Sequence, residues 1–155
     1  MSDARWIEVL DDADWAVTHF ARAVEIDRVG GFEGDGLEAY KARMALLQAM
    51  QSGYTSLEGS LERILEILGE EKPVGAAYHA DLVRRVSRDL PGERPALLDP
   101  ELARAVDETR RFRHVARKNY NNFRVEEAGR ALAAAALIRD RLPAALRRFR
   151  AVMEP

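Results

Sequence analysis

The sequence predicts an all-α protein that folds as one helical bundle. Apolar residues recur at intervals of three and four along nearly the whole chain, which is the period of an amphipathic helix. No stretch alternates apolar and polar residues with the two-residue period of a half-buried strand. The chain has 155 residues, of which 47% are hydrophobic, enough to build one core of single-domain size. We therefore expect a single domain, residues 1–155, of about five helices.

The first two expected helices cover about residues 3–28 and 37–68. The segment GGFEGDG, residues 30–36, separates them, because glycine adopts the turn and left-handed conformations that end helices. This segment is a connecting loop rather than a phosphate-binding loop, since no strand precedes it and no Lys-Ser/Thr pair follows it. The helix 37–68 carries the longest apolar seam, and such a seam packs side by side with other helices in a bundle.

Three further helices are expected in the second half of the chain. The third covers about residues 76–88. The run Asp99-Pro100-Glu101 begins the fourth, with an N-cap aspartate, proline at the first helical position and an acid in the first turn. Asn121 and Asn122 are turn and cap signals before the fifth, about 124–150. Because their seams are longest, we expect the second and fifth helices to be the longest.

Composition excludes several classes of chemistry. The chain has no cysteine, so it forms no disulfide, zinc–thiolate site, iron–sulfur cluster or thiol nucleophile. Acidic side chains are not aligned as metal ligands, and we expect neither a metal site nor a cofactor. The N-terminal segment is acidic and amphipathic, unlike a signal peptide, and no apolar run reaches membrane-spanning length. These features predict a cytoplasmic protein without a membrane segment.

The charge is balanced overall but concentrated locally. With 24 basic and 26 acidic residues, the formal net charge of −2 is not that of a strongly basic nucleic-acid binder. Residues 110–118, however, contain five cations and no acid. These cations are Arg110, Arg111, Arg113, Arg117 and Lys118. The cluster predicts a local site for an anion.

Two titratable residues lie elsewhere on apolar helix faces. Glu58 interrupts the seam of the second helix, and a carboxylate in such a place needs a partner or a shifted pKa. We favour Glu58 as a structural partner of an arginine over a catalytic role. His79 lies beside the apolar face of the third helix, and a lone histidine in that position is more often structural than a ligand.

The segment ETRRFRHVARKNYNNF, residues 108–123, has the residues needed to cleave RNA without a metal ion. A guanidinium binds phosphate through a fork of donors, and the imidazole of His114 can move a proton at neutral pH. The ribose 2′-hydroxyl is the nucleophile in such a reaction, so the protein supplies a base, an acid and charge stabilisation. We expect Arg110, Arg117 and Asn119 to bind the RNA phosphate.

The same segment resembles the signature of the HepT-like toxins of the HEPN superfamily. That signature is an arginine, four residues, a histidine, one residue and a tyrosine, and here the frame falls on Arg113, Lys118 and Tyr120. The segment SGYTSLEGSLERILEILGE is similar to the family's long second helix, and YHADLVRRV to its third. RPALLD followed by RRFRHVARKNY resembles the approach to the motif. The likeness covers about residues 40–149.

The resemblance implies a fold, an activity and a partner. The fold is a HEPN-like helical bundle that forms a homodimer with two motifs facing a shared cleft. The activity is that of a metal-independent endoribonuclease toxin acting on RNA, with Arg113, His114, Lys118 and Tyr120 as catalytic residues. The partner is a nucleotidyltransferase antitoxin of the MNT type that transfers AMP to the motif tyrosine, Tyr120.

One departure from the signature keeps more than one function under consideration. Lys118 occupies the histidine position, and an ammonium group, with a reference pKa of about 10.4, is a poor base at neutral pH unless it is desolvated. His114, four residues earlier on the same helical flank, is the other candidate for proton transfer. The second hypothesis is a catalytically inactive HEPN subunit that binds a nucleotide, RNA or a nucleotidyltransferase through Arg113, Arg117 and Tyr120. The third is an interaction bundle with solvated arginines and a core tyrosine.

Overall fold

The structure, a computed structural model, describes residues 3–155 and confirms the all-α fold class. That range contains five α-helices, two short 3₁₀ helices and no strand; a single isolated bridge joins Leu90 to Arg94 in a loop. The α-helices are α1 (Arg5–Val29), α2 (Leu37–Ile67), α3 (Tyr78–Val86), α4 (Pro100–Asn119) and α5 (Gly129–Met153), and the 3₁₀ helices are η1 (Tyr120–Asn122) and η2 (Val125–Ala128). Within residues 3–155, no helix is both long and apolar enough to cross a membrane.

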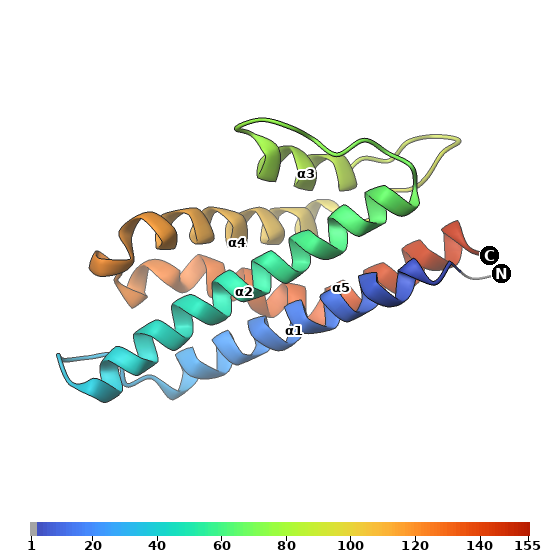
Figure 1. Ribbon diagram of the computed structural model, residues 1–155. Coiled ribbons are helices and arrows are strands. Elements are labelled where there is room, and N and C mark those ends of the chain that lie inside the picture. Colours follow the sequence, from blue (N-terminus) through green and yellow to red (C-terminus); the bar gives the residue numbers. More distant parts are fainter. Residues whose placement is uncertain (1–2) are drawn as a thin grey trace.

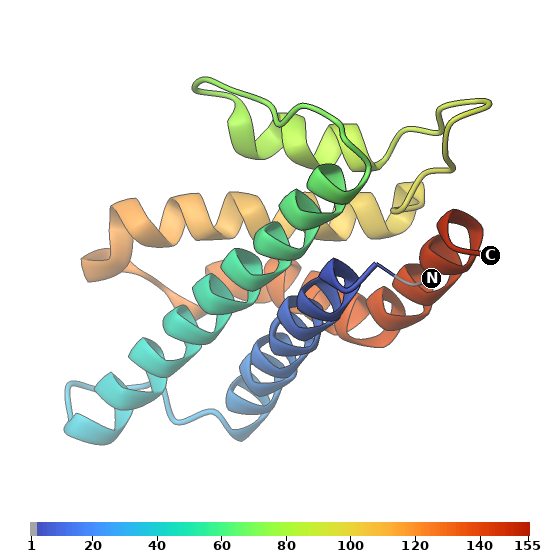
Figure 2. The same cartoon turned by 45° about the vertical axis from the view of Figure 1, so that its right-hand side comes forward.

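Helices α1, α2, α4 and α5 form an antiparallel bundle, and the short α3 lies on one side of it, alongside α4 (Figures 1 and 2). Helix α1 packs against α2 and α5, while α4 packs against α5 and α2. The short α3 packs on α4 and α2, on one side of the bundle. The two ends of the described chain meet, because the Asp3 backbone N–H donates to Glu154 Oε1 at 2.7 Å.

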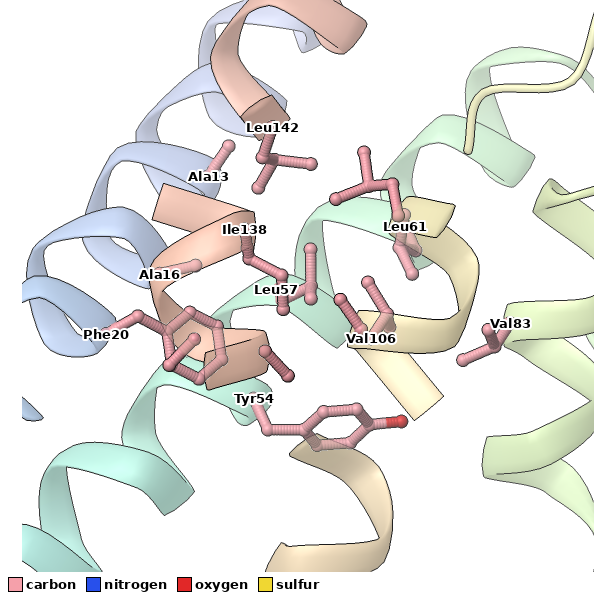
Figure 3. Packing of buried hydrophobic residues seen from close by; sticks show 14 of the residues in the cluster. Ala13, Ala16, Phe20, Tyr54, Leu57, Leu61, Val83, Val106, Ile138 and Leu142 are labelled. Carbon is pink, nitrogen blue, oxygen red and sulfur yellow. The ribbon is translucent and has the colours of Figure 1, made fainter. Parts of the chain in front are cut away.

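The bundle core is assembled from one buried face of each long helix. Figure 3 shows the side chains of Phe20, Leu57, Val106 and Ile138 converging from α1, α2, α4 and α5. Burying this much apolar surface is the main stabilising term for the fold. The ring of Phe20 on α1 packs directly against α2 at Gly53, where an added Cβ would lie 2.7 Å from two of its ring atoms.

The boundaries of the helices agree with several sequence signals. Gly30, with φ of 75°, follows the last residue of α1 in a conformation that favours glycine. Asp99 is the N-cap of α4, where its Oδ1 accepts from the backbone N–H of Leu102 at 2.8 Å, and Pro100 is the first helical residue. This hydrogen bond, followed by the charge of Arg141, lowers the pKa of the Asp99 carboxyl.

Two expectations about the helices are only partly met. Helix α2 is the longest at 31 residues, but α5 equals α1 at 25 residues, because residues 125–128 form a 3₁₀ turn before α5 begins. The apolar seam of α2 is not buried at its start, where Leu37 is 66% and Tyr40 is 55% exposed. The first turns of α2 project beyond the end of α1, so nothing on that side covers them (Figure 1).

A buried arginine fixes the chain on both sides of α3. Arg94 is 6% exposed, and its Nε and Nη2 donate to the two carboxylate oxygens of Glu70 at 2.6 and 3.1 Å. Its guanidinium also donates to the backbone carbonyls of Arg88, Arg85 and Pro95. A buried charge that is paired and fully hydrogen-bonded holds its partners in one geometry. Arg94 thereby ties the loop after α3 to the end of α2.

The close contact at Gly53 yields a stability prediction. We expect Gly53→Ala to lower the free energy of unfolding by about 1–3 kcal/mol, because the new methyl group overlaps the fully buried ring of Phe20. Urea unfolding followed by far-UV circular dichroism measures this change. Gly129→Ala is the matched control, because a Cβ there meets nothing within 4 Å; its stability should be unchanged or higher, since alanine is the better helix former. Equal stability of the Gly53→Ala protein and the wild type would contradict the packing described here.

Candidate functional site

The C-terminal half of α4 places its cations on one exposed flank of the bundle. Thr109, Phe112 and Ala116 are buried on the opposite side of α4, which faces the core. Residues three or four positions apart share a helix face. Arg110, Arg113 and Arg117 have this spacing and therefore lie together on a second face of α4, next to the buried one. The buried face of α4 therefore determines where the basic cluster points.

These side chains line a pocket of about 370 Å³ between α3 and α4. Five of the seven site residues expected from the sequence are among its lining residues: Arg110, Arg113, His114, Arg117 and Lys118. Asn119 and Tyr120 are not. Tyr120 lies just beyond the end of α4, in η1, with 55% of its surface exposed.

The pocket has more cations than acids. Arg110 is paired with Asp107, Nε to Oδ1, at 2.7 Å. Within residues 3–155, neither Arg113, Arg117 nor Lys118 forms a salt bridge with an acidic side chain. Three cations without acidic partners, close together at the mouth of one pocket, favour binding of an anion with several oxygen atoms, such as a phosphate.

Arg113 is positioned by an aromatic ring rather than by an acid. Its Cζ atom lies 5.8 Å from the centroid of the Tyr54 ring, a cation–π distance. Tyr54 is 1% exposed, and Figure 3 shows its hydroxyl directed out of the apolar cluster toward the α3 side. Burial, followed by the charge and hydrogen bond of Glu58, raises the pKa of Tyr54 far above its usual range. Tyr54 thus remains a neutral phenol beside the Glu58 carboxylate.

Glu58 pairs with a histidine, which corrects our expectation of an arginine partner. Its Oε2 lies 2.5 Å from Nδ1 of His79, and the side chains of Glu58 and His79 are 14% and 42% exposed. The Tyr54 ring meets the imidazole edge-on, with centroids 6.4 Å apart. His79 also lines the pocket that contains the five α4 residues. From the sequence we expected a structural role for His79 more often than that of a ligand, and its position beside the α4 residues is known only from the structure.

A second carboxylate connects α2 to α3 one helical turn further along. The Tyr78 hydroxyl donates to Glu62 Oε1, and burial followed by this hydrogen bond raises the pKa of Tyr78. Glu58 and Glu62 are four residues apart on α2, while their partners are adjacent on α3. Two acids on one helix face opposite a Tyr-His pair were the sequence signal that could have indicated this contact.

A separate hollow of about 530 Å³ adjoins the basic cluster on the side of α1 and α2. It shares Arg113 and Arg117 with the first pocket, and its other lining residues are His19, Gln48, Gln51, Ser52, Thr55 and Ser56. Amide and hydroxyl groups can donate and accept hydrogen bonds with sugar hydroxyls and base edges. The two arginines therefore lie between a cationic pocket and a neutral polar one.

A larger hollow than the pocket beside α4 does not suit an anion. It measures about 790 Å³, lies between the end of α1 and the start of α5, and contains Asp27, Glu33 and Glu126 but no lysine or arginine. No group of three or more potential metal-ligating side chains lies close enough in residues 3–155 to hold a metal ion. The pocket beside α4 is thus the place where the described side chains favour binding of a charged ligand.

Comparison with known proteins supports the resemblance found in the sequence. A family model described as HepT-like protein matches residues 45–153, which include all of α3, α4 and α5 and most of α2. No curated protein and no solved structure matches the chain significantly. The match covers more than half of the chain and includes the whole basic pocket. The chain belongs to the HepT-like family of the HEPN superfamily.

Proposed function

We propose that this protein is the toxin component of a cytoplasmic toxin–antitoxin system, an endoribonuclease that cleaves RNA without a metal ion. The pocket lined by Arg110, Arg113 and Arg117 together with His114 is the observation that carries the proposal. It combines phosphate-binding guanidinium groups with an imidazole in a space of about 370 Å³. Membership of the HepT-like family supports the same activity.

Each group has a role that follows from its surroundings. Arg113 binds the scissile phosphate, with Arg110 and Arg117 beside it. Its guanidinium contacts the Tyr54 ring and has no acidic partner in the described chain. The attacking 2′-oxygen adds negative charge to the phosphate oxygens, and these fixed cations stabilise it. Lys118 contributes a further positive charge at the position of the family's histidine, and His114 transfers a proton. Asn119, at the end of α4, contacts the RNA backbone outside the pocket.

A second candidate function is that of a catalytically inactive HEPN subunit. Lys118 at the histidine position of the motif favours it, because an ammonium is a poor general base. Such a subunit would still bind RNA, a nucleotide or a nucleotidyltransferase through Arg113, Arg117 and Tyr120. Binding of RNA without cleavage by the wild-type protein would identify this function.

We further propose that the protein is a homodimer and that its antitoxin is an MNT-type nucleotidyltransferase. The exposed side chains of Val115 and Tyr120, 41% and 55% accessible near the end of α4, and membership of the HepT-like family support an assembly at this end of the helix. A twofold dimer would bring two copies of the pocket to one RNA-binding cleft. A monomeric mass in sedimentation or light-scattering measurements would argue against this assembly.

Removing one guanidinium group tests the phosphate site. We expect Arg113→Ala to lower RNA cleavage at least about 100-fold and to weaken RNA binding, because the substitution removes the central phosphate contact. Cleavage of a labelled RNA in the presence of EDTA, and binding by fluorescence anisotropy, measure the two effects. Arg111→Ala is the matched control, since Arg111 belongs to the same basic run but pairs with Asp107 and does not line the pocket. Equal loss in both variants would mean that only general charge matters.

Tyr120 is the proposed site of neutralisation by AMP. Its phenol is exposed enough for another enzyme to reach, and it lies two residues beyond Lys118. AMP attached there would bring a phosphate to the end of the basic cluster and compete with RNA for its cations. Incubation with the cognate nucleotidyltransferase and ATP should add one AMP, detected by mass spectrometry, and abolish cleavage.

The control for this modification is a second exposed tyrosine. Tyr40 is also 55% exposed but lies at the start of α2, outside the basic pocket. Tyr120→Phe should prevent AMP addition, whereas Tyr40→Phe should not affect it. An adenylate that persists in the Tyr120→Phe protein would refute the assignment.

A further inference from the structure

The pocket contains a second imidazole, which comes from a different helix and has its own carboxylate. His79 on α3 lines the pocket together with the arginines of α4, and its Nδ1 is 2.5 Å from Glu58 Oε2 on α2. Three helices that are separate in sequence thus contribute to one constellation. We propose that His79, positioned by Glu58, is the general base of RNA cleavage in this protein; this inference rests on the proposed ribonuclease function.

The contact with Glu58 determines which nitrogen of the imidazole is available. A carboxylate can only accept hydrogen bonds, so the proton of the neutral ring lies on Nδ1 and Nε2 carries the free lone pair. An imidazole oriented by a carboxylate through Nδ1 and accepting a proton through Nε2 is the arrangement used by hydrolases with a catalytic triad. Because Nδ1 is engaged by Glu58, Nε2 is the nitrogen left for a ligand in the pocket.

Glu58 is well suited to positioning because it is itself constrained. Its side chain is 14% exposed and lies beside the buried Tyr54 phenol. Tyr54 in turn underlies the guanidinium of Arg113 at 5.8 Å. One chain of contacts therefore connects the phosphate-binding arginine to the proposed base through Tyr54 and Glu58. Glu58 thus lies between His79 and Tyr54 and forms no salt bridge to Arg113 in the described chain.

The proposed step can be written with every proton accounted for. Nε2 of His79 accepts the proton of the ribose 2′-hydroxyl while the 2′-oxygen bonds to phosphorus, and the bond from phosphorus to the 5′-oxygen breaks. The leaving 5′-oxygen takes a proton from the imidazolium of His114, on α4. The products are a 2′,3′-cyclic phosphate and a 5′-hydroxyl end. Exchange with water then removes the added proton from His79 and returns a proton to His114.

This assignment gives the departure at Lys118 a physical explanation. If α3 supplies the base, the motif position on α4 does not have to accept a proton. A lysine there adds a fixed positive charge beside the phosphate, which stabilises the same transition state electrostatically. Proton transfer and charge stabilisation are thereby divided between α3 and α4.

Kinetics of substituted proteins test the role of His79. We expect His79→Gln to lower kcat for RNA cleavage at least about 100-fold while KM changes less than about twofold, because a general base acts on the chemical step. His79→Ala should regain part of its activity when free imidazole is added, a rescue that a purely structural role would not give. Arg84→Gln, on the exposed part of the same helix, is the control and should cleave RNA like the wild type.

A matched pair on α2 separates positioning from helix packing. Glu58→Gln should lower kcat about 10-fold or more, since the amide no longer fixes one tautomer of His79. Glu62→Gln alters the neighbouring contact of α2 with α3, at Tyr78, and should change kcat less than about threefold. Equal losses in the two variants would indicate that Glu58 acts only by holding α3, and would overturn its assignment.

The outcomes distinguish this inference from the proposed function. If the wild-type protein does not cleave RNA, both the proposed function and the role of His79 are wrong. If it cleaves RNA and the His79→Gln protein cleaves equally well, only the role of His79 is overturned. Nitrogen chemical shifts of the imidazoles give a readout independent of activity. They should report a proton on Nδ1 of His79 and a change at Nε2 when uridine 3′-monophosphate is added. A proton on Nε2 instead, or no response to the nucleotide, would contradict the proposal.

Discussion

The docking of α3 against α2 and α4 is the constraint on which the proposed site depends. Leu82, Val83 and Val86 bury one face of α3 against the bundle, and the buried Arg94–Glu70 pair secures the following loop to the end of α2. Only with α3 in this place does His79 reach both Glu58 and the pocket beside the arginines. Without α3, the four-helix bundle would present only the basic face of α4. Helix α3 adds one side of the pocket and the oriented imidazole of His79.

The electrostatics of the pocket follow from how its few acids are used. Glu58 contacts the imidazole of His79 and lies beside Tyr54, and Asp107 pairs with Arg110 and Arg111. Arg113 rests instead on the ring of Tyr54, which orients a guanidinium without neutralising it. Tyr54 therefore lies between the guanidinium that rests on its ring and the carboxylate that contacts His79. A pocket built in this way has an excess of positive charge that an RNA phosphate would satisfy.

The sequence predicted the features that are encoded within single helices. Helical periodicity, the glycine stop at Gly30 and the Asp99 cap each depend on residues a few positions apart, and the structure agrees with them. The shared flank of Arg110, Arg113 and Arg117 was predictable for the same reason. The Glu58–His79 pair was not, because it depends on the placement of two helices whose residues are 21 positions apart. The burial of Arg94 and the exposure of Leu37 and Tyr40 likewise depend on how neighbouring elements end, which a seam within one helix does not reveal.

The central claim is that this pocket promotes attack of a ribose 2′-hydroxyl on its own phosphodiester without a metal ion. The most direct measurement compares an RNA oligonucleotide with the same molecule carrying a single 2′-deoxynucleotide at the cleaved position, in the presence of EDTA, with analysis of the product ends. We expect the RNA to be cut to a 2′,3′-cyclic phosphate and a 5′-hydroxyl end, and the 2′-deoxy substitution to block cleavage at that position. Cleavage of the 2′-deoxy substrate at the same position, 5′-phosphate products, or activity that disappears with EDTA would contradict it.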